Sequence, residues 1–227
     1  HCAPMPVVNY KNRLWRAFEK RTDEETFSFV MSASVDSNLL KAENWKKTNK
    51  ISNKKAGFTW REGNVVIDRK NDEILNIIRY EPPEGGKAAV LHVGDEGNNI
   101  YFDSELDIID FPGGSKKFTI RYDGKTKLYW TLSNPVLDEY KGYDPERTRN
   151  VLALMSSPDL RNWSIQSIIL HHPDVKNHGF QYIDWQFENK DIIFVSRTAY
   201  DDGLGGAHNC HDANFLTFHR IEDFRES

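Results

Sequence analysis

Short runs of alternating apolar and polar residues, rich in β-branched and aromatic side chains, fill most of the chain, whereas helical periodicity is scarce. Alternation with a period of two predicts β-strands. Four stretches share one arrangement: a strand, a tight polar turn and a second strand. They read PVVNYKNRLWRAFEK, NVVIDRKNDEILNIIRY, FTIRYDGKTKLYWTLSN and YIDWQFENKDIIFVSRT, and their turns hold the Asn, Asp, Gly and Lys residues that suit two-residue hairpins.

Further strands are expected after each hairpin. Third strands are predicted at FSFVMSAS, AAVLHVG, VLALMSS and NFLTFHR, and fourth strands at WKKTNKIS, NIYF and WSIQSIIL, so that the last repeat lacks a fourth strand. Repeats of four antiparallel strands are typical of propeller blades. The pattern therefore predicts an all-β fold, a β-propeller of four-stranded antiparallel blades, with about four blades in a single domain spanning residues 1–227.

Composition narrows the possible partners. The 227 residues are 38% hydrophobic and 28% charged, which is ordinary for a globular protein, and the net charge of -4 leaves no basic surface for nucleic acid. No apolar run approaches the roughly 18 residues that a membrane-spanning helix needs. We therefore expect neither a nucleic acid partner nor a membrane span.

The beginning of the chain and its two cysteines leave questions open. No recognisable leader precedes His1, and HCAPMPVV opens in the middle of the strand rhythm, so we expect one or two N-terminal blades to be absent. Cys2 and Cys210 are too few for a disulfide scaffold. They could pair if the chain ends meet, which the sequence does not decide.

Two segments that follow third strands have the form Ser-x-Asp…Trp. They are SSPDLRNW, from Ser156 to Trp163, and the looser SASVDSNLLKAENW, from Ser32 to Trp45. Both resemble degenerate Asp-boxes, in which the Asp side chain accepts hydrogen bonds from backbone N–H groups of the turn and the Trp packs between sheets. Asp159 and Trp163 are therefore expected to serve the fold.

These segments, together with NRLWRAFE, FPGGSKKFTIRYD, HGFQYIDWQF and SRTAYDDGLGGAHNCHDANFLTFHRIEDFR, resemble the sialidase (BNR-repeat) superfamily, in particular bacterial sialidase-like or exo-α-sialidase-like proteins. The resemblance spans nearly the whole chain. It implies a propeller of six blades, or five as in related glycosidases, of which this chain would hold part. It also implies a glycoside hydrolase whose substrate is a carbohydrate and which needs no cofactor.

Propeller geometry predicts where the chemistry lies. The start of the innermost strand, the end of the second strand and the loop after it gather at one mouth of the central channel. In the last repeat these places are HGFQY, SRTAY and the loop from Thr198 to Phe215, which holds three Asp, two His, one Cys, two Asn and three Gly. We therefore expect a glycan-binding site there. Predicted substrate-binding residues are Arg79, Arg197, His178, Gln181, Asn64, Lys117, His208, Asn209, His211 and Asp212.

Arg79 and Arg197 occupy matched positions near the ends of second strands. Two guanidinium groups at one mouth could grip a carboxylate with paired N–H donors. The family resemblance implies such a clamp, normally of three Arg, for the substrate carboxylate. The alternative is that each Arg pairs with a carboxylate of its own blade, and the sequence leaves both readings open.

Several residues are candidates for catalysis. Asp184 lies between Ile183 and Trp185 in an inner strand expected to be packed on both faces, so it is either a general acid or base tuned by burial or a structural Asp. Sialidases use a Tyr nucleophile assisted by Glu, whereas most glycosidases use two carboxylates. The predicted catalytic set is therefore Asp184, Asp201, Asp202, Tyr200 and Glu62, with Tyr80 and Glu19 as further candidates.

A metal site is the weaker interpretation of the same loop. His208, Cys210, His211 and Asp212 have side chains that Zn²⁺ accepts, but their spacing matches no established metal motif. We therefore predict no metal and keep His208, Cys210 and His211 as the alternative.

Three functions remain in competition. The leading hypothesis is a glycoside hydrolase of the sialidase-like type. The others are a non-catalytic glycan-binding propeller and a glycosidase for an uncharged sugar that uses an Asp acid/base pair. An extracytoplasmic location is favoured for a glycan-degrading enzyme.

Overall fold

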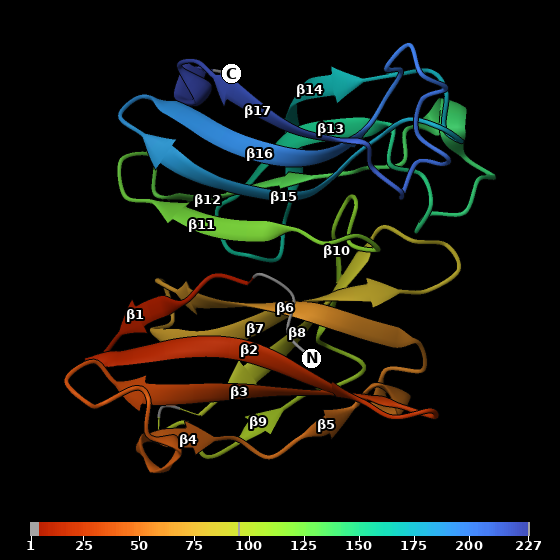
Figure 1. The fold of residues 1–227 in the computed structure, drawn as a ribbon. Coiled ribbons are helices and arrows are strands. Elements are labelled where there is room, and N and C mark those ends of the chain that lie inside the picture. Colours follow the sequence, from red (N-terminus) through yellow and green to blue (C-terminus); the bar gives the residue numbers. More distant parts are fainter. Residues whose placement is uncertain (1–4, 95, 227) are drawn as a thin grey trace. The chain divides into compact units, whose positions relative to one another are not determined.

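The computed structural model describes residues 5–94 and 96–226. Its strands form four successive antiparallel sheets, with helix limited to short 3-10 turns, so the predicted fold class is confirmed as an all-β fold with four propeller blades in this chain (Figure 1). The chain divides into two compact units. The first unit holds the residues up to Pro82 and Ala88–Ile109, and the second holds Pro83–Lys87 and the residues from Asp110 onward.

Two sheets make up the first unit. Sheet 1 comprises β1 (Val8–Tyr10), β2 (Arg13–Arg21), β3 (Thr26–Ser34), β4 (Trp45–Lys47) and β5 (Ile51–Ser52), with the 3-10 turns η1 (Ala42–Asn44) and η2 (Asn53–Lys55) beside the last two. Sheet 2 comprises β6 (Thr59–Asp68), β7 (Glu73–Glu81), β8 (Lys87–Val93), β9 (Ile100–Tyr101) and β10 (Ile108–Asp110).

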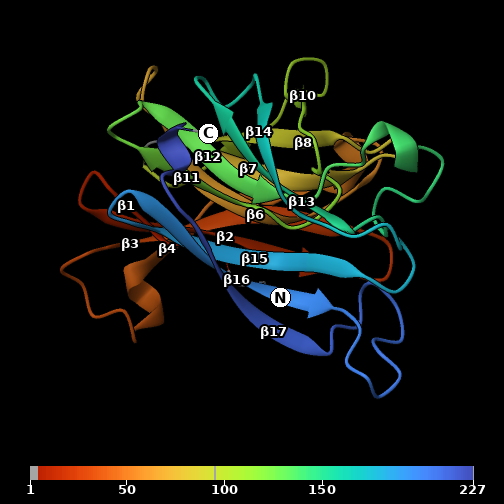
Figure 2. The ribbon, with the colours of Figure 1, turned by 90° about the horizontal axis from the view of Figure 1, so that it is seen from above.

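The second unit also holds two sheets. Sheet 3 comprises β11 (Thr119–Asp123), β12 (Leu128–Ser133), β13 (Val151–Ser157) and β14 (Ser164–His171), and η3 (Asp138–Tyr140) lies in its long β12–β13 loop. Sheet 4 comprises β15 (Gly179–Glu188), β16 (Asp191–Ala199) and β17 (Phe215–Ile221), followed by η4 (Phe224–Glu226). Its three strands lie side by side in both views (Figures 1 and 2).

The hairpins and third strands follow the sequence pattern closely. The expected fourth strand WKKTNKIS forms two short strands, β4 and β5, and β10 is a strand that the pattern did not predict. Asn12, Asp72 and Asn189 have positive φ in the hairpin turns, which Asn and Asp tolerate better than other residues with a Cβ. Local turn chemistry therefore sets the hairpins.

A tryptophan joins the two sheets within each unit. In the first unit the buried indole of Trp60, in β6, donates a hydrogen bond to the Thr26 carbonyl oxygen, 3.1 Å away. In the second unit the indole of Trp185, in β15, donates to the Thr119 carbonyl oxygen at 2.8 Å. Each ring buries a large apolar surface, worth about 1.5–3 kcal/mol for a side chain of this kind, while its N–H group is satisfied.

The β13–β14 turn is held by Asp159. Its carboxylate accepts hydrogen bonds from the backbone N–H groups of Arg161 and Asn162 at 2.9 and 2.8 Å. The indole of Trp163 donates to the Leu160 carbonyl oxygen and packs against Phe111. Both residues therefore have the structural contacts expected of them.

None of the helical turns among the described residues is long or apolar enough to cross a membrane.

Candidate active site

The inner strands of sheets 2 and 4 share an irregularity. The pairing register shifts between Arg61 and Asn64 in β6, and between Gln181 and Asp184 in β15. Within each bulge one non-glycine residue has a positive φ: Glu62 at 57° and Tyr182 at 53°. Such a conformation costs about 1–3 kcal/mol and bulges of this kind re-aim side chains, often beside functional sites. The two bulges therefore mark the places where the site should be sought.

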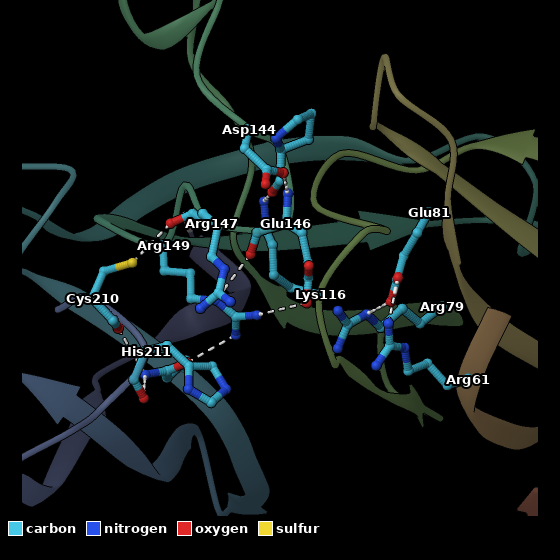
Figure 3. A network of polar contacts seen from close by, with 12 residues as sticks. Arg61, Arg79, Glu81, Lys116, Asp144, Glu146, Arg147, Arg149, Cys210 and His211 are labelled. Carbon is cyan, nitrogen blue, oxygen red and sulfur yellow. Dashed lines mark hydrogen bonds and ion pairs between the residues drawn. The ribbon is translucent and has the colours of Figure 1, made fainter. Parts of the chain in front are cut away.

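In the first unit the bulge belongs to a buried ionic network. The backbone N–H of Glu62 donates to the Glu19 carboxylate at 2.9 Å, and the Glu62 carboxylate accepts from Arg79 at the same distance. Arg79 also pairs with Glu81 at 2.7 Å, and Arg61 pairs with the other oxygen of Glu81. Figure 3 shows Arg61 and Arg79 directed at Glu81.

The predicted residues of the first unit make structural contacts within that unit. Arg79 is 1% exposed and contacts two carboxylates, which is the alternative reading of its place at a strand end. Asn64 is fully buried inside sheet 2. A role for Glu62, Asn64 or Arg79 in substrate binding or catalysis stays a prediction, but the contacts seen here stabilise the unit.

In the second unit the bulge lies in a group that we call the arginine–tyrosine cluster. The guanidinium carbon of Arg197 lies 4.8 Å from the ring centre of Tyr182, and that of Arg149 lies 5.7 Å from it. The ring of His211 meets the Tyr182 ring edge-on, with centroids 6.1 Å apart. The cluster comprises Arg149, Gln181, Tyr182, Arg197 and His211.

Hydrogen bonds to the loop between β16 and β17 hold the cluster in place. Arg149 donates to the side-chain oxygen of Gln181 at 2.8 Å, and the Gln181 amide nitrogen donates to the carbonyl oxygens of Cys210 and His211. Arg197 donates to the same His211 carbonyl at 2.9 Å. Figure 3 shows Arg149, which precedes β13, and His211, which lies in the loop between β16 and β17. Gln181 thus ties the loop to the inner strand.

The charged members of the cluster differ in their acidic partners. Arg197 forms no ion pair with any residue that the structure describes, and the Tyr182 hydroxyl makes no hydrogen bond within the same part of the chain. Glu146 lies 3.9 Å from Arg149, at the limit of an ion pair. A half-buried guanidinium beside an unused phenol is suited to a ligand that brings an anionic oxygen.

Most polar residues of the loop serve the loop itself. The carboxylate of Asp202 accepts from the N–H groups of Leu204 and Gly206 and from Asn214, and these hydrogen bonds lower the pKa of Asp202. Asn209 caps the N–H groups of His211 and Asp212, and the Asp212 carboxylate accepts from Asn209. A carboxyl group kept ionised by such donors is a poor general acid.

A second group lies at the start of β15, and we call it the histidine cluster. The rings of His172 and His178 stack with centroids 3.5 Å apart, and the Tyr200 ring meets both edge-on. The His178 imidazole lies 3.3 Å from the Asp174 carboxylate and 3.5 Å from that of Asp201. Asp201 and Tyr200, both predicted catalytic residues, thus meet the predicted binding residue His178.

The expected burial of Asp184 is wrong. Its side chain is 58% exposed, its oxygen lies 3.4 Å from Arg121, and it accepts from the Trp185 N–H. The described residues pack only the Ile183 and Trp185 face of this strand, so Asp184 on the other face meets solvent. The catalytic role of Asp184 stays a prediction.

The remaining predicted residues are placed as follows. Lys117 is buried and donates to Thr119 and to the Ile183 carbonyl oxygen, whereas His208 is exposed. The buried Cys210 thiol donates to the Arg147 carbonyl oxygen, and burial raises its pKa (Figure 3). His1 and Cys2 lie outside the described residues, and a pairing of Cys2 is not tested. No group of three or more His, Cys, Asp and Glu side chains suited to a metal occurs within residues 5–94 and 96–226.

Tyr182 and Arg149 were not among the predicted site residues. Tyr182 reads as an ordinary strand aromatic in HGFQYIDW, and only the bulge turns it toward Arg197. Arg149 precedes β13 in the sequence PERTRN, at the end of a long loop. The one signal in the sequence was position, because both residues lie at strand ends of the predicted mouth.

Comparison with known proteins supports the fold. No family model and no curated protein matches the sequence. Solved structures that resemble it include an exo-β-1,3-galactanase from Clostridium thermocellum, with TM-score 0.56 and 11% identity over 89% of this chain and 46% of that one.

A β-fructofuranosidase from Schwanniomyces occidentalis resembles the chain with TM-score 0.60 and 14% identity, over 96% of this chain and 46% of that one. An inulosucrase from Halalkalicoccus jeotgali gives TM-score 0.53 and 12% identity, over 85% and 57%. The chain thus spans about half the length of these proteins. The fold is shared with carbohydrate-active enzymes, and none of the three is named a sialidase.

Proposed function

We propose that the protein is a glycoside hydrolase of the sialidase-like type, which binds a carboxylate-bearing sugar at the arginine–tyrosine cluster. The observation that carries the proposal is Arg197, a half-buried guanidinium with no acidic partner among the described residues, held over the ring of Tyr182. The likeness of the fold to the galactanase and the fructofuranosidase supports a carbohydrate substrate.

The cluster suits this ligand for electrostatic reasons. A hydrogen bond to a charged group contributes about 1.5–3 kcal/mol, and a guanidinium presents paired donors that match a carboxylate. Because the His211 carbonyl fixes one nitrogen of Arg197, little side-chain freedom is lost when a ligand binds. The Tyr182 hydroxyl lies in the same cluster and is available to a substrate hydroxyl or reacting carbon.

The geometry favours an acidic sugar over an uncharged one. An enzyme for an uncharged sugar would need a pair of carboxyl groups, one of them protonated. Of the three Asp candidates, Asp202 is held ionised by backbone donors and Asp184 is exposed.

The test is hydrolysis of chromogenic glycosides by the full-length protein. The panel contains an aryl sialoside, an aryl glucuronide and aryl glycosides of neutral hexoses. We expect turnover of an acidic glycoside, and Arg197→Gln should raise its KM by roughly 10- to 100-fold, the equivalent of one hydrogen bond to a charged group.

The matched control is Arg220→Gln. Arg220 lies in the same sheet, but it is paired with Glu188 and Asp191. Its KM for the acidic glycoside should stay within about twofold of the wild-type value, as is usual for a surface change away from the site. If no glycoside is hydrolysed while an acidic glycan still binds, the protein is a glycan-binding module. If neutral glycosides alone are hydrolysed, the carboxylate site is wrong.

A further inference from the structure

The imidazole of His178 is a buried titratable group that the carboxylate-binding site does not use. It precedes β15, and its side chain is 5% exposed. One ring nitrogen, Nδ1, lies 3.3 Å from Oδ2 of Asp174, and the other, Nε2, lies 3.5 Å from Oδ1 of Asp201. Nε2 makes no hydrogen bond within the described part of the chain. The buried Nε2 of His178 therefore lies close to the Asp201 carboxylate, which is 79% exposed on the loop.

Asp174 fixes the orientation of this imidazole. Burial alone would raise the pKa of the Asp174 carboxyl, but hydrogen bonds from the Asn177 side chain and from the N–H groups of Lys176 and Asn177 outweigh it and lower the pKa to about 2. Asp174 is therefore ionised at neutral pH and accepts the proton of Nδ1. The lone pair of a neutral His178 then lies on Nε2, toward Asp201.

Two further rings, those of His172 and Tyr200, pack against the His178 imidazole. His172, stacked on it, accepts the Asp174 N–H at its own Nδ1, 3.1 Å away. Burial, followed by the nearby imidazoles of His178 and His171, lowers the pKa of His172. The Tyr200 ring packs edge-on against both imidazole rings.

The histidine cluster lies along the same strand pair as the arginine–tyrosine cluster. Gln181 pairs with Arg197, and Gly179 pairs with Ala199 two steps further along the ladder. His178 and Tyr200 flank that last pair. The distance from Arg197 to Tyr200 along an extended strand is roughly 10 Å. Asp201 follows Tyr200, so both clusters belong to the same end of the β15–β16 pair.

We propose that Asp174, His178 and Asp201 form a proton relay in which Asp201 is the catalytic acid and base and His178 is the positioning residue that supplies its proton. The proposal rests on the glycoside hydrolase function and names a further part of its machinery. The proton on Nε2 passes to Asp201, which donates it to the glycosidic oxygen as the bond to the sugar carbon breaks. The water that attacks in turn gives its proton to Asp201, and this proton returns to Nε2, so the relay ends in its starting state.

The first test needs no activity. Nuclear magnetic resonance of ¹⁵N-His and ¹³C-Asp protein reports the tautomer of His178 and the protonation of Asp201 together. We expect neutral His178 to carry its proton on Nδ1, and the His178 and Asp201 resonances to change over a shared pH range. In Asp201→Asn the His178 change should become a simple one-step curve. A proton on Nε2 in neutral His178, or independent curves for the two residues, overturns the relay.

The second test uses the acidic glycoside. Asp201→Asn and His178→Gln should each lower kcat roughly 100- to 10,000-fold, as expected for general acid–base catalysis, and the double variant should lose no more than the worse single one. KM should change little. Formate should restore part of the activity of Asp201→Ala, which a structural role would not allow.

The control is His219→Gln. His219 is in the same sheet, stacks on Phe194 and lies outside both clusters; its kcat should match the wild type. Additive losses in the double variant would overturn the shared path. If no glycoside is hydrolysed but the resonances are coupled, the hydrolase function fails while the shared proton stands. If His178→Gln does not fold, the test rests on Asp201→Asn, which should fold because the Asp201 side chain is exposed.

Discussion

The two bulged strands place their polar side chains in opposite electrostatic states. In the first unit Glu62 and Arg79 lie in a buried network in which carboxylates and guanidinium groups match one another. In the second unit Arg197 has no acidic partner among the described residues. The same kind of bulge thus lies in a buried ion-paired network in one sheet and beside a guanidinium without an acidic partner among the described residues in the other. The proposed function rests on this difference in charge pairing between the two networks.

The largest effect should follow from breaking the closed network. Arg79→Met removes the guanidinium that pairs with the buried Glu62 and leaves Glu81 with Arg61 alone, and removing one member of a buried pair costs about 3–5 kcal/mol. Urea unfolding should show this loss in the free energy of unfolding. Arg61→Met is the matched control because Arg61 is 27% exposed, and its loss should be nearer 1 kcal/mol. Equal losses would show that the network is not a closed unit.

A smaller effect is expected from undocking the loop of the open site. A Cβ on Gly179 would lie 2.4 Å from the Cys210 carbonyl oxygen, so Gly179→Ala forces the loop away from β15. We expect a loss of about 1–3 kcal/mol, as for overpacking, and weaker binding of the acidic sugar. Gly124→Ala, which meets no atom within 4 Å, should be neutral or slightly stabilising. Unchanged sugar binding in Gly179→Ala would separate the loop from the site.

The smallest effect concerns acid. The pKa of Asp174 is about 2 in the folded chain, below its ordinary value near 4. Its carboxylate therefore stabilises the fold above about pH 4, and this contribution is lost as the pH falls toward about 2. Wild-type protein should lose stability more steeply over that interval than Asp174→Asn, as measured by urea unfolding at each pH. Parallel curves would show that Asp174 is not held by its donors.

Much of the fold was readable from the sequence because strand alternation and hairpin turns are local properties. YIDWQF and NVVID were assigned to strands correctly. The positive φ of Tyr182 was not readable, because a bulge depends on pairing with a neighbouring strand. The exposure of Asp184 was mispredicted for a related reason: alternation says which residues share a face, but not whether another sheet covers it. Glu81 lies two residues after Arg79 in the sequence. The sequence alone did not show whether Arg79 would pair with this carboxylate or with a ligand.

The most direct test of the central claim is a comparison of two ligands that differ by one charge. Isothermal titration of the full-length protein with N-acetylneuraminic acid α-methyl glycoside and with its methyl ester isolates the carboxylate. We predict that the wild type prefers the free acid by at least about tenfold, the value of one hydrogen bond to a charged group, and that Arg197→Gln loses this preference. Equal affinity of the wild type for acid and ester, or an undiminished preference in Arg197→Gln, would contradict the account.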